Sequence, residues 1–190
     1  MCSSDLWLCG PKGTAFLHVR REMQAHIDAT VLSWGYVEGT AGHTGFEAYL
    51  GHTDLERRLQ WQGTRDLAPF LAVPAALEFQ RANNWLSVRQ ACHDQAVNLL
   101  HRCCAQSGLT PSAPDTSYGQ MAPIPVRTPD PEGLRRYLFD RHRIEVPVTG
   151  HGPQSFVRAS VQAYNTAADL DALVEALKDA LPGAPITNHS

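Results

Sequence analysis

The sequence predicts an α/β protein in two domains, and three features of the chain support this prediction. Segments of alternating apolar and polar residues, typical of strands, are interleaved with segments whose apolar residues recur every three or four positions, typical of helices. A connection rich in proline and serine, residues 109–120, separates the two halves. The chain has 190 residues, 43% of them hydrophobic, which suffices for one or two packed cores.

The first half contains one predicted strand and two predicted helices. Residues 14–19 alternate well enough for a strand, whereas residues 33–54 are rich in Gly, Thr and His and predict a long irregular loop. A helix is predicted over residues 67–82 with Asp66 as its N-cap, and a second over 84–107 with a glycine behind it. The apolar stripe of the second helix is Trp85, Val88, Cys92, Ala96, Leu99 and Cys103.

The second half predicts a short sheet with two helices. Strands are expected over residues 121–126, 144–148 and 156–164. Prolines at alternate positions of the first strand suit a sheet edge. Asp130 and the pair Thr166 and Asp169 are expected to cap the helices. The positions expected to face the core are Leu134, Tyr137, Leu138, Ile144, Val146, Val148, Val157, Ala159, Val161, Ala163, Leu170, Leu173, Val174 and Leu177.

Charge and cysteine content exclude several classes of protein. The net charge is -3 and there is no basic run, so neither nucleic acid nor an anionic membrane surface is an expected partner. No stretch approaches the roughly 18 apolar residues that a membrane helix needs. The cysteine number, five, is odd and no secretory signal precedes them, which predicts reduced thiols in the cytoplasm.

Arg158 is the first candidate site residue. It lies on the polar face of a predicted strand, between small residues. One interpretation is a solvent-facing arginine on an open sheet. The other is a carboxylate site, because a guanidinium binds a carboxylate through two parallel hydrogen bonds that fix its position and plane.

Gly63 and Thr64 are the second candidate. A Gly-Thr pair before a helix offers backbone N–H groups and a hydroxyl to an anion, and the helix N-terminus adds partial positive charge. The alternative is a simple helix start capped by Asp66, and the tripeptide is too short to decide between them.

Histidines and cysteines raise the question of a metal site, which is the weakest hypothesis. Cys92 and Cys103 share a helix face, but at 1.5 Å per residue about 16 Å separates them, too far to share an ion. Core packing explains both residues better. No metal ligand is therefore assigned. The histidines of the predicted loops, His43, His52 and His151, are either general acids or bases or simply solvated.

Six segments in order resemble the class V aminotransferase superfamily, the pyridoxal-phosphate enzymes of fold type I, and most closely its isopenicillin N epimerase-like branch. They are "WLCGPKGTAFLHVR", "SWGY", "WQGTRDLAPFLAVPAALEF", "MAPIPV", "LFDRHRIEVPV" and "VRASVQAYNTAADLDAL". The resemblance implies that residues 1–108 end a large cofactor-binding domain and that residues 109–190 form the small C-terminal α+β domain. It also implies a homodimer and pyridoxal 5'-phosphate as cofactor.

The resemblance implies binding roles for three residues, but the position of the family's Schiff-base lysine is not occupied by lysine. Gly63 and Thr64 match the pair that reaches the cofactor phosphate from the neighbouring subunit, and Arg158 matches the arginine that holds the substrate α-carboxylate. In such enzymes a His-Lys pair stands directly before the "Trp-Leu" that Trp7 begins. Here the lysine position holds Leu6, which cannot form a Schiff base, and Asp5 stands at the histidine position.

We interpret the first six residues, "MCSSDL", as non-native. The codons TGC TCT TCC GAT CTN encode "CSSDL" and match the end of a common sequencing adapter. An intact reading frame upstream of Trp7 in the native locus supports this interpretation, and genomic DNA that encodes "MCSSDL" after a stop codon contradicts it.

The expected function is that of a fragment of a pyridoxal-phosphate enzyme acting at the α-carbon of an amino acid substrate. Without the Schiff-base lysine, the chain as given is expected to be inactive. Lys12 is a turn lysine in the family and does not replace the catalytic one. The alternative is a non-catalytic dimerisation or binding partner of a full-length relative.

Overall fold

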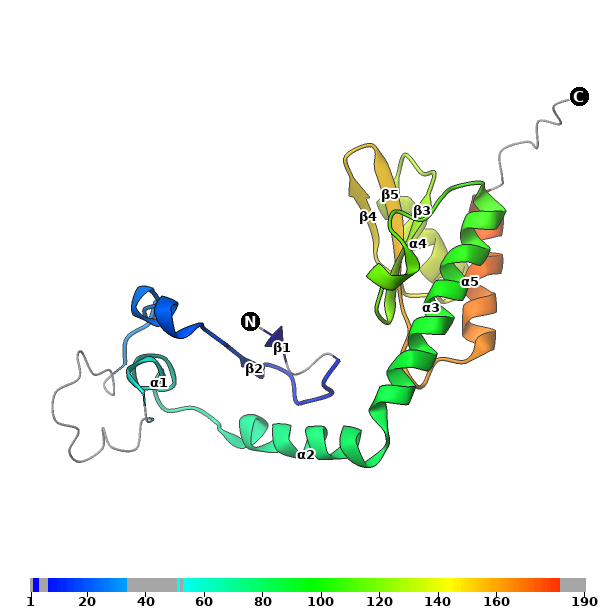
Figure 1. Ribbon diagram of the computed structural model, residues 1–190. Coiled ribbons are helices and arrows are strands. Elements are labelled where there is room, and N and C mark those ends of the chain that lie inside the picture. The colour runs from blue at the N-terminus through cyan, green and yellow to red at the C-terminus, as the bar shows by residue number, and fades with distance from the viewer. Residues whose placement is uncertain (1, 4–6, 34–50, 52, 182–190) are drawn as a thin grey trace, which may run out of the picture. The chain divides into compact units, whose positions relative to one another are not determined.

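The computed structural model describes residues 2–3, 7–33, 51 and 53–181 and divides into two compact units, Met1–Asn83 and Asn84–Ser190 (Figure 1). Asp5, Leu6, His43 and His52 lie outside the described residues. The domain boundary near residue 108, which the sequence and the family resemblance predict, stays a prediction.

Two short antiparallel strands and three helical segments form the described part of the first unit. Strand β1 (Cys2–Ser3) pairs with β2 (Ala15–Phe16), and a 3₁₀ helix, η1 (Arg21–His26), follows. The strand predicted over residues 14–19 is therefore shorter than expected, because only two of its residues find a partner strand. Helices α1 (Asp54–Leu59) and α2 (Ala68–Ala82) complete the unit.

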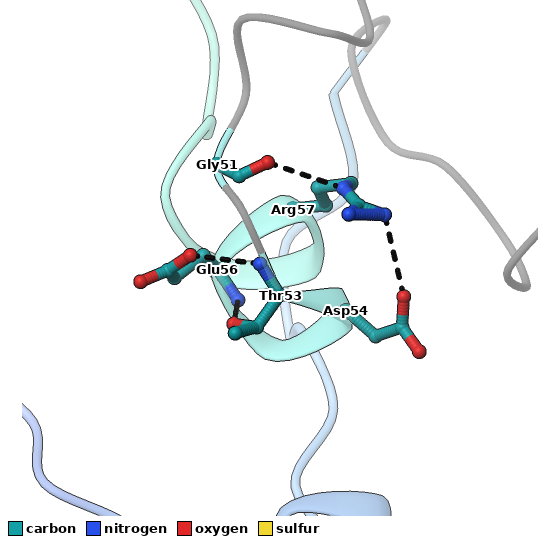
Figure 2. A network of polar contacts seen from close by, with 5 residues as sticks. All are labelled: Gly51, Thr53, Asp54, Glu56 and Arg57. Atoms are coloured by element: carbon teal, nitrogen blue, oxygen red, sulfur yellow. Dashed lines mark hydrogen bonds and ion pairs between the residues drawn. The ribbon is translucent and has the colours of Figure 1, made fainter. Parts of the chain in front are cut away.

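Helix α1 begins in a reciprocal capping box that the sequence analysis missed (Figure 2). The Glu56 N–H donates to the Thr53 hydroxyl at 3.2 Å, and the Thr53 N–H donates to the Glu56 carboxylate at 2.8 Å. Arg57 donates to the Gly51 carbonyl at 3.2 Å and lies 3.4 Å from the Asp54 carboxylate. Threonine followed three residues later by glutamate is the signal that could have found this helix.

Helix α2 begins one residue later than the sequence predicts, with Leu67 rather than Asp66 as its N-cap. The Asp66 carboxylate accepts a hydrogen bond from the Ala68 N–H at 2.9 Å, which satisfies one of the donors that a helix N-terminus leaves open. Leu67 is the N-cap residue and has no side-chain cap of its own. The helix then continues past Pro74 to Ala82.

The second unit contains a three-stranded antiparallel sheet in the order β3-β5-β4. Its strands are β3 (Met121–Val126), β4 (Val148–His151) and β5 (Gln154–Ser160). The prediction of β3 as an edge strand is confirmed. The strands expected over 144–148 and 156–164 are displaced: β4 begins at Val148, and β5 spans 154–160.

Three helices accompany the sheet: α3 (Trp85–Ser107), α4 (Pro131–His142) and α5 (Ala167–Ala180). Their predicted caps are confirmed. The Gly133 N–H donates to the Asp130 carboxylate at 2.8 Å, and Thr166 and Asp169 form a reciprocal capping box. Gly108 ends α3 with a φ of +66°, a left-handed conformation that glycine adopts without strain.

The hydrophobic core of the second unit joins one face of the sheet to the inner sides of the helices. Its buried members are Cys92, Ala96, Leu99, Leu100, Cys103, Cys104, Ala122, Ile124, Val126, Leu134, Leu138, Val157, Ala159, Val161, Leu173, Val174, Ala176 and Leu177. The predicted stripe of α3 is thus confirmed for Cys92, Ala96, Leu99 and Cys103; Val88 packs against this core half-buried, and Trp85 is half-buried outside it. Ala163 and Tyr137 were expected to face the core but are exposed. Ala163 lies beyond the end of β5, and the Tyr137 hydroxyl donates to Asp179 at 2.7 Å instead.

The described helices of the second unit pack on one face of this sheet. α3 packs on β3, α4 on β4, and α3 and α5 lie side by side, linked by an ion pair of 2.7 Å between Arg102 and Asp171 (Figure 1). Alternate residues of β5 therefore face the core, and the residues between them face the open side. The mixed α/β class is confirmed, whereas the pyridoxal-phosphate fold stays a prediction. None of the described helices has the length and apolar character needed to cross a membrane.

Replacing Leu99 by alanine tests this core. Leu99 is fully buried, so Leu99→Ala should lower the free energy of unfolding of the second unit by about 2–5 kcal/mol. Leu86→Ala serves as the control, because Leu86 is 77% exposed and its replacement should change this free energy by no more than about 0.5 kcal/mol. Urea unfolding followed by circular dichroism measures both, and equal effects would contradict the assigned core.

Candidate functional site

Arg158 lies on the open face of the sheet, as the sequence predicts. It occupies the central strand, β5, between the buried residues Val157 and Ala159, and its own side chain is exposed. The two-residue period of the strand fixes this orientation: any change that turned Arg158 inward would expose both apolar neighbours. The buried face of β5 thus determines where the guanidinium is presented.

Prolines flank Arg158 on both neighbouring segments. Pro123 of β3 is its direct cross-strand partner, and the Arg158 N–H donates to the Pro147 carbonyl at 3.0 Å. Neither proline carries a charge or a side-chain hydrogen-bonding group. Within the described part of the chain, no carboxylate pairs with the Arg158 guanidinium. Its donors are therefore available to an external carboxylate, although the same exposure also suits a solvated surface arginine.

Gly63 and Thr64 lie in the segment that joins α1 to α2. Gly63 has a φ of +107°, in the region that favours glycine, and a Cβ there would lie 3.5 Å from the Ser33 hydroxyl, so conformation rather than space favours glycine. Thr64 is exposed, and its hydroxyl has no hydrogen bond to a described residue. This hydroxyl is available to an anion.

The local charge at the start of α2 partly opposes an anion. The Asp66 carboxylate already accepts a hydrogen bond from the Ala68 N–H. The Arg65 guanidinium lies over the Phe70 ring, 4.7 Å from the ring centre. The Arg65 side chain also donates to the Gln60 carbonyl at 3.2 Å. The prediction of Asp66 as the N-cap is wrong by one residue, although its carboxylate accepts from the Ala68 N–H, and the binding of a phosphate by Thr64 stays a prediction. Arg158 and Thr64 belong to different units, so their proximity also stays a prediction.

Neither lysine of the chain is placed like a buried Schiff-base residue. Lys12 is exposed in the turn that Thr14 closes by donating from its hydroxyl to the Pro11 carbonyl at 2.7 Å. Lys178 is exposed on α5, 3.8 Å from the Glu175 carboxylate. Neither lysine thus lies in an enclosed site where it could hold the aldehyde of pyridoxal phosphate, and a contact between Thr64 and the phosphate of this cofactor stays a prediction.

The histidines and cysteines of the second unit have structural partners. The His101 ring lies 2.8 Å from the Asp115 carboxylate, and His93 lies 3.2 Å from the Gly119 carbonyl. Burial raises the pKa of the Cys92, Cys103 and Cys104 thiols, to about 11 for Cys103. His151, which was predicted to lie in a loop, is instead the exposed last residue of β4 and pairs with Gln154. Over the residues that the structure describes, no three His, Cys, Asp or Glu side chains gather as metal ligands would.

An open depression, which was not predicted, lies at the far end of the sheet. It has a volume of about 480 Å³ and includes Arg127, Thr128 and Ser155 in its lining, but not Arg158. The Arg127 guanidinium donates to the Ser107 carbonyl at 3.0 Å and so connects the depression to the end of α3. No sequence pattern could have indicated it, because segments more than forty residues apart form its walls.

The fold and these candidates define an α/β chain with an arginine presented on an uncovered sheet face, and comparison with known proteins then specifies the family. No family model matches the chain. It is 35% identical over 180 residues to an isopenicillin N epimerase of Amycolatopsis lactamdurans, a match that covers 93% of this chain and 45% of that protein. It is 35% identical over 187 residues to an isopenicillin N epimerase of Streptomyces clavuligerus, covering 95% of this chain and 46% of that protein.

The chain is similar over nearly its whole length to these two isopenicillin N epimerases, which confirms the resemblance to this branch that the sequence indicates. It spans slightly less than half the length of the two curated relatives.

Thiol modification tests the assignment of the buried cysteines to the core. At pH 8, a thiol with a pKa of about 11 is ionised to roughly one part in a thousand, so Cys103 should react with iodoacetamide far more slowly than the exposed Cys9. Its rate should rise about tenfold per pH unit between pH 8 and pH 10, as the thiolate forms. Peptide mass spectrometry measures both rates, and a Cys103 rate at pH 8 equal to that of Cys9 contradicts the assignment.

Proposed function

We propose that this chain carries part of the site of a pyridoxal-phosphate-dependent enzyme of the isopenicillin N epimerase type, which acts at the α-carbon of an amino acid. The observation that supports the proposal most strongly is the exposed Arg158 guanidinium, which has no carboxylate partner among the described residues. Two parallel hydrogen bonds from this group would fix the position and the plane of a substrate α-carboxylate. A carboxylate held in this way gives the bonds at the α-carbon a defined orientation.

Gly63 and Thr64 are proposed to hold the cofactor phosphate. The Thr64 hydroxyl donates to a phosphate oxygen, and the glycine allows the backbone to approach closely. We propose that they do so across the interface of a homodimer. When bound, pyridoxal phosphate supplies an electron sink for a carbanion at the α-carbon. Epimerisation, transamination and elimination share this requirement, and the names of the two relatives favour epimerisation.

The chain alone is proposed to be inactive, because its two lysines are exposed and the position expected for the Schiff-base residue is leucine. A second candidate function is that of a non-catalytic dimerisation or binding partner of a full-length relative. The exposed Thr64 favours it, since this residue is expected to act across a subunit interface. A defined oligomer of the purified chain supports the second candidate, whereas aggregation opposes it. A cytoplasmic location stays part of the proposal.

A carboxylate titration followed by NMR tests the role of Arg158. L-alanine should shift the Arg158 side-chain N–H signal with a dissociation constant of roughly 0.2–0.7 M, because an exposed charged pair contributes only about 0.2–1 kcal/mol. L-alaninamide, which lacks the carboxylate, should not shift it. Arg135 is the internal control, since its guanidinium is already held by the Glu132 carboxylate at 2.6 Å. Equal shifts of Arg158 and Arg135, or equal effects of both ligands, would exclude a specific carboxylate site.

Absorbance spectroscopy with stoichiometric pyridoxal phosphate tests the inactivity of the chain alone. No visible absorbance that depends on a lysine should develop, because neither Lys12 nor Lys178 lies in an enclosed site. The variants Lys12→Arg and Lys178→Arg should give the same spectrum as the unmodified chain. A borohydride-reducible adduct on Lys12, identified by mass spectrometry, contradicts this prediction.

A further inference from the structure

The depression at the far end of the sheet has no part in the proposed function. It lies where β3 ends and β5 begins, beside the segment that follows α3. All of its lining residues belong to the described part of the second unit. Its volume of about 480 Å³ falls within the range of small-molecule sites, roughly 300–1,000 Å³. The depression is therefore large enough to hold a small organic ligand.

The floor of the depression, formed by its buried and half-buried lining residues, offers mainly apolar surface. Val126 and its cross-strand partner Ser155 are buried, and Leu109 is half-buried beside them. The polar groups of the floor already have partners. The Ser155 hydroxyl donates to the Thr128 carbonyl at 3.3 Å, and the Thr128 hydroxyl is hydrogen-bonded to the backbone N–H and carbonyl of Asp130, both at 3.1 Å.

The charge of the depression comes from Arg127. No other lining residue is charged, and Arg127 forms no ion pair with a described residue. Asp130, the acidic residue nearest to it in sequence, caps α4 by accepting from the Gly133 N–H at 2.8 Å. An uncompensated cation at the rim of an apolar hollow favours an anionic ligand.

One edge of the Arg127 guanidinium is fixed, and the other is open. Nη1 donates to the Ser107 carbonyl at 3.0 Å, which ties the group to the last residue of α3. Nε and Nη2 share the opposite edge and have no hydrogen bond to a described residue. Two parallel donors match the two oxygens of a carboxylate. Because the bond to Ser107 already restricts the side chain, less conformational freedom is lost when a ligand binds.

We propose that the depression binds a small carboxylate ligand, with the carboxylate on the open edge of Arg127 and an apolar group on the floor. The charge selects an anion, the parallel donors select a carboxylate, and the floor selects a ligand with a hydrocarbon or aromatic part.

This site goes beyond the proposed function, which relies on Arg158. Ser107 belongs to α3, which packs on the covered face of the sheet, whereas Arg158 lies on the opposite face. One small ligand therefore does not contact both arginines.

A titration of the full chain with 3-phenylpropionate, followed by NMR, tests the proposal. We expect a saturable shift of the Arg127 Nε–H signal and nuclear Overhauser effects between the ring protons of the ligand and the Leu109 methyl groups. Acetate, which lacks the ring, should bind at least about tenfold more weakly, because it buries little apolar surface. The uncharged 3-phenylpropanamide should bind about two- to fivefold more weakly, which is the contribution of an exposed ion pair.

Substitutions at Arg127 locate the carboxylate contact. Arg127→Gln should weaken the binding of 3-phenylpropionate about two- to fivefold and leave that of 3-phenylpropanamide unchanged. Arg127→Lys should lose less affinity, because it retains the charge and a donor for Ser107 but lacks the parallel donors. Arg136→Gln is the matched control: Arg136 is exposed on α4 of the same unit, lies outside the lining, and should not affect binding. Circular dichroism checks that each variant is folded.

Four outcomes would overturn the proposal. They are the absence of a saturable shift at Arg127, equal affinities for 3-phenylpropionate and its amide, equal effects of Arg127→Gln and Arg136→Gln, and a larger shift at Arg158 than at Arg127. The comparison of ligands needs only the unmodified chain, so it decides the question even if a variant does not fold. Failure of L-alanine to bind at Arg158 would leave this result unaffected.

Discussion

The packing of β5 against the helices of the second unit determines the orientation of the candidate substrate residue. Val157 and Ala159 are buried beneath the sheet, and the alternation of the strand directs Arg158 between them to the opposite face. Hydrogen bonds to β3 and β4 hold this register on both sides. A slip of one residue would bury a charged guanidinium, which is far more costly than any single contact on the open face.

Local sequence patterns predicted the second unit well where local interactions decide the structure. The helix caps at Asp130, Thr166 and Gly108 follow from residues one turn apart, and the structure confirms all three. The stripe of α3 follows from a repeat of three and four residues. Such features need no knowledge of distant parts of the chain.

The strand boundaries of the second unit could not be predicted in this way. Ile144, Val146 and Val148 alternate like a strand and are half-buried against the core, yet sheet pairing begins only at Val148. Pro147 explains the difference in part, because proline lacks the N–H that a continuing ladder needs. The predicted strand over residues 14–19 is longer than β2 for a related reason. A strand needs a partner from a distant part of the chain, and the local alternation does not show whether one is present.

In the candidate site, too, the features set by neighbouring residues were predictable and those formed by distant segments were not. The strand pattern predicted that Arg158 faces away from the core, which the structure confirms. The sequence placed the N-cap of α2 at Asp66, one residue before the observed N-cap, Leu67. The depression beside Arg127 was not predicted, because distant segments form it. Whether Arg158 and Thr64 act on one ligand depends on how separate units assemble. The local sequence around either residue does not determine this assembly.

Among the residues that the structure describes, the two units differ in what they bury: the second has an apolar core, whereas the buried residues of the first are the polar Thr14 and Gln80. Hydrogen exchange of the chain alone tests this difference most directly. The account predicts strong protection of amides in α3 and β5, such as those of Leu99 and Val157, and weak protection along α2. Protection of α2 equal to that of α3 would contradict it.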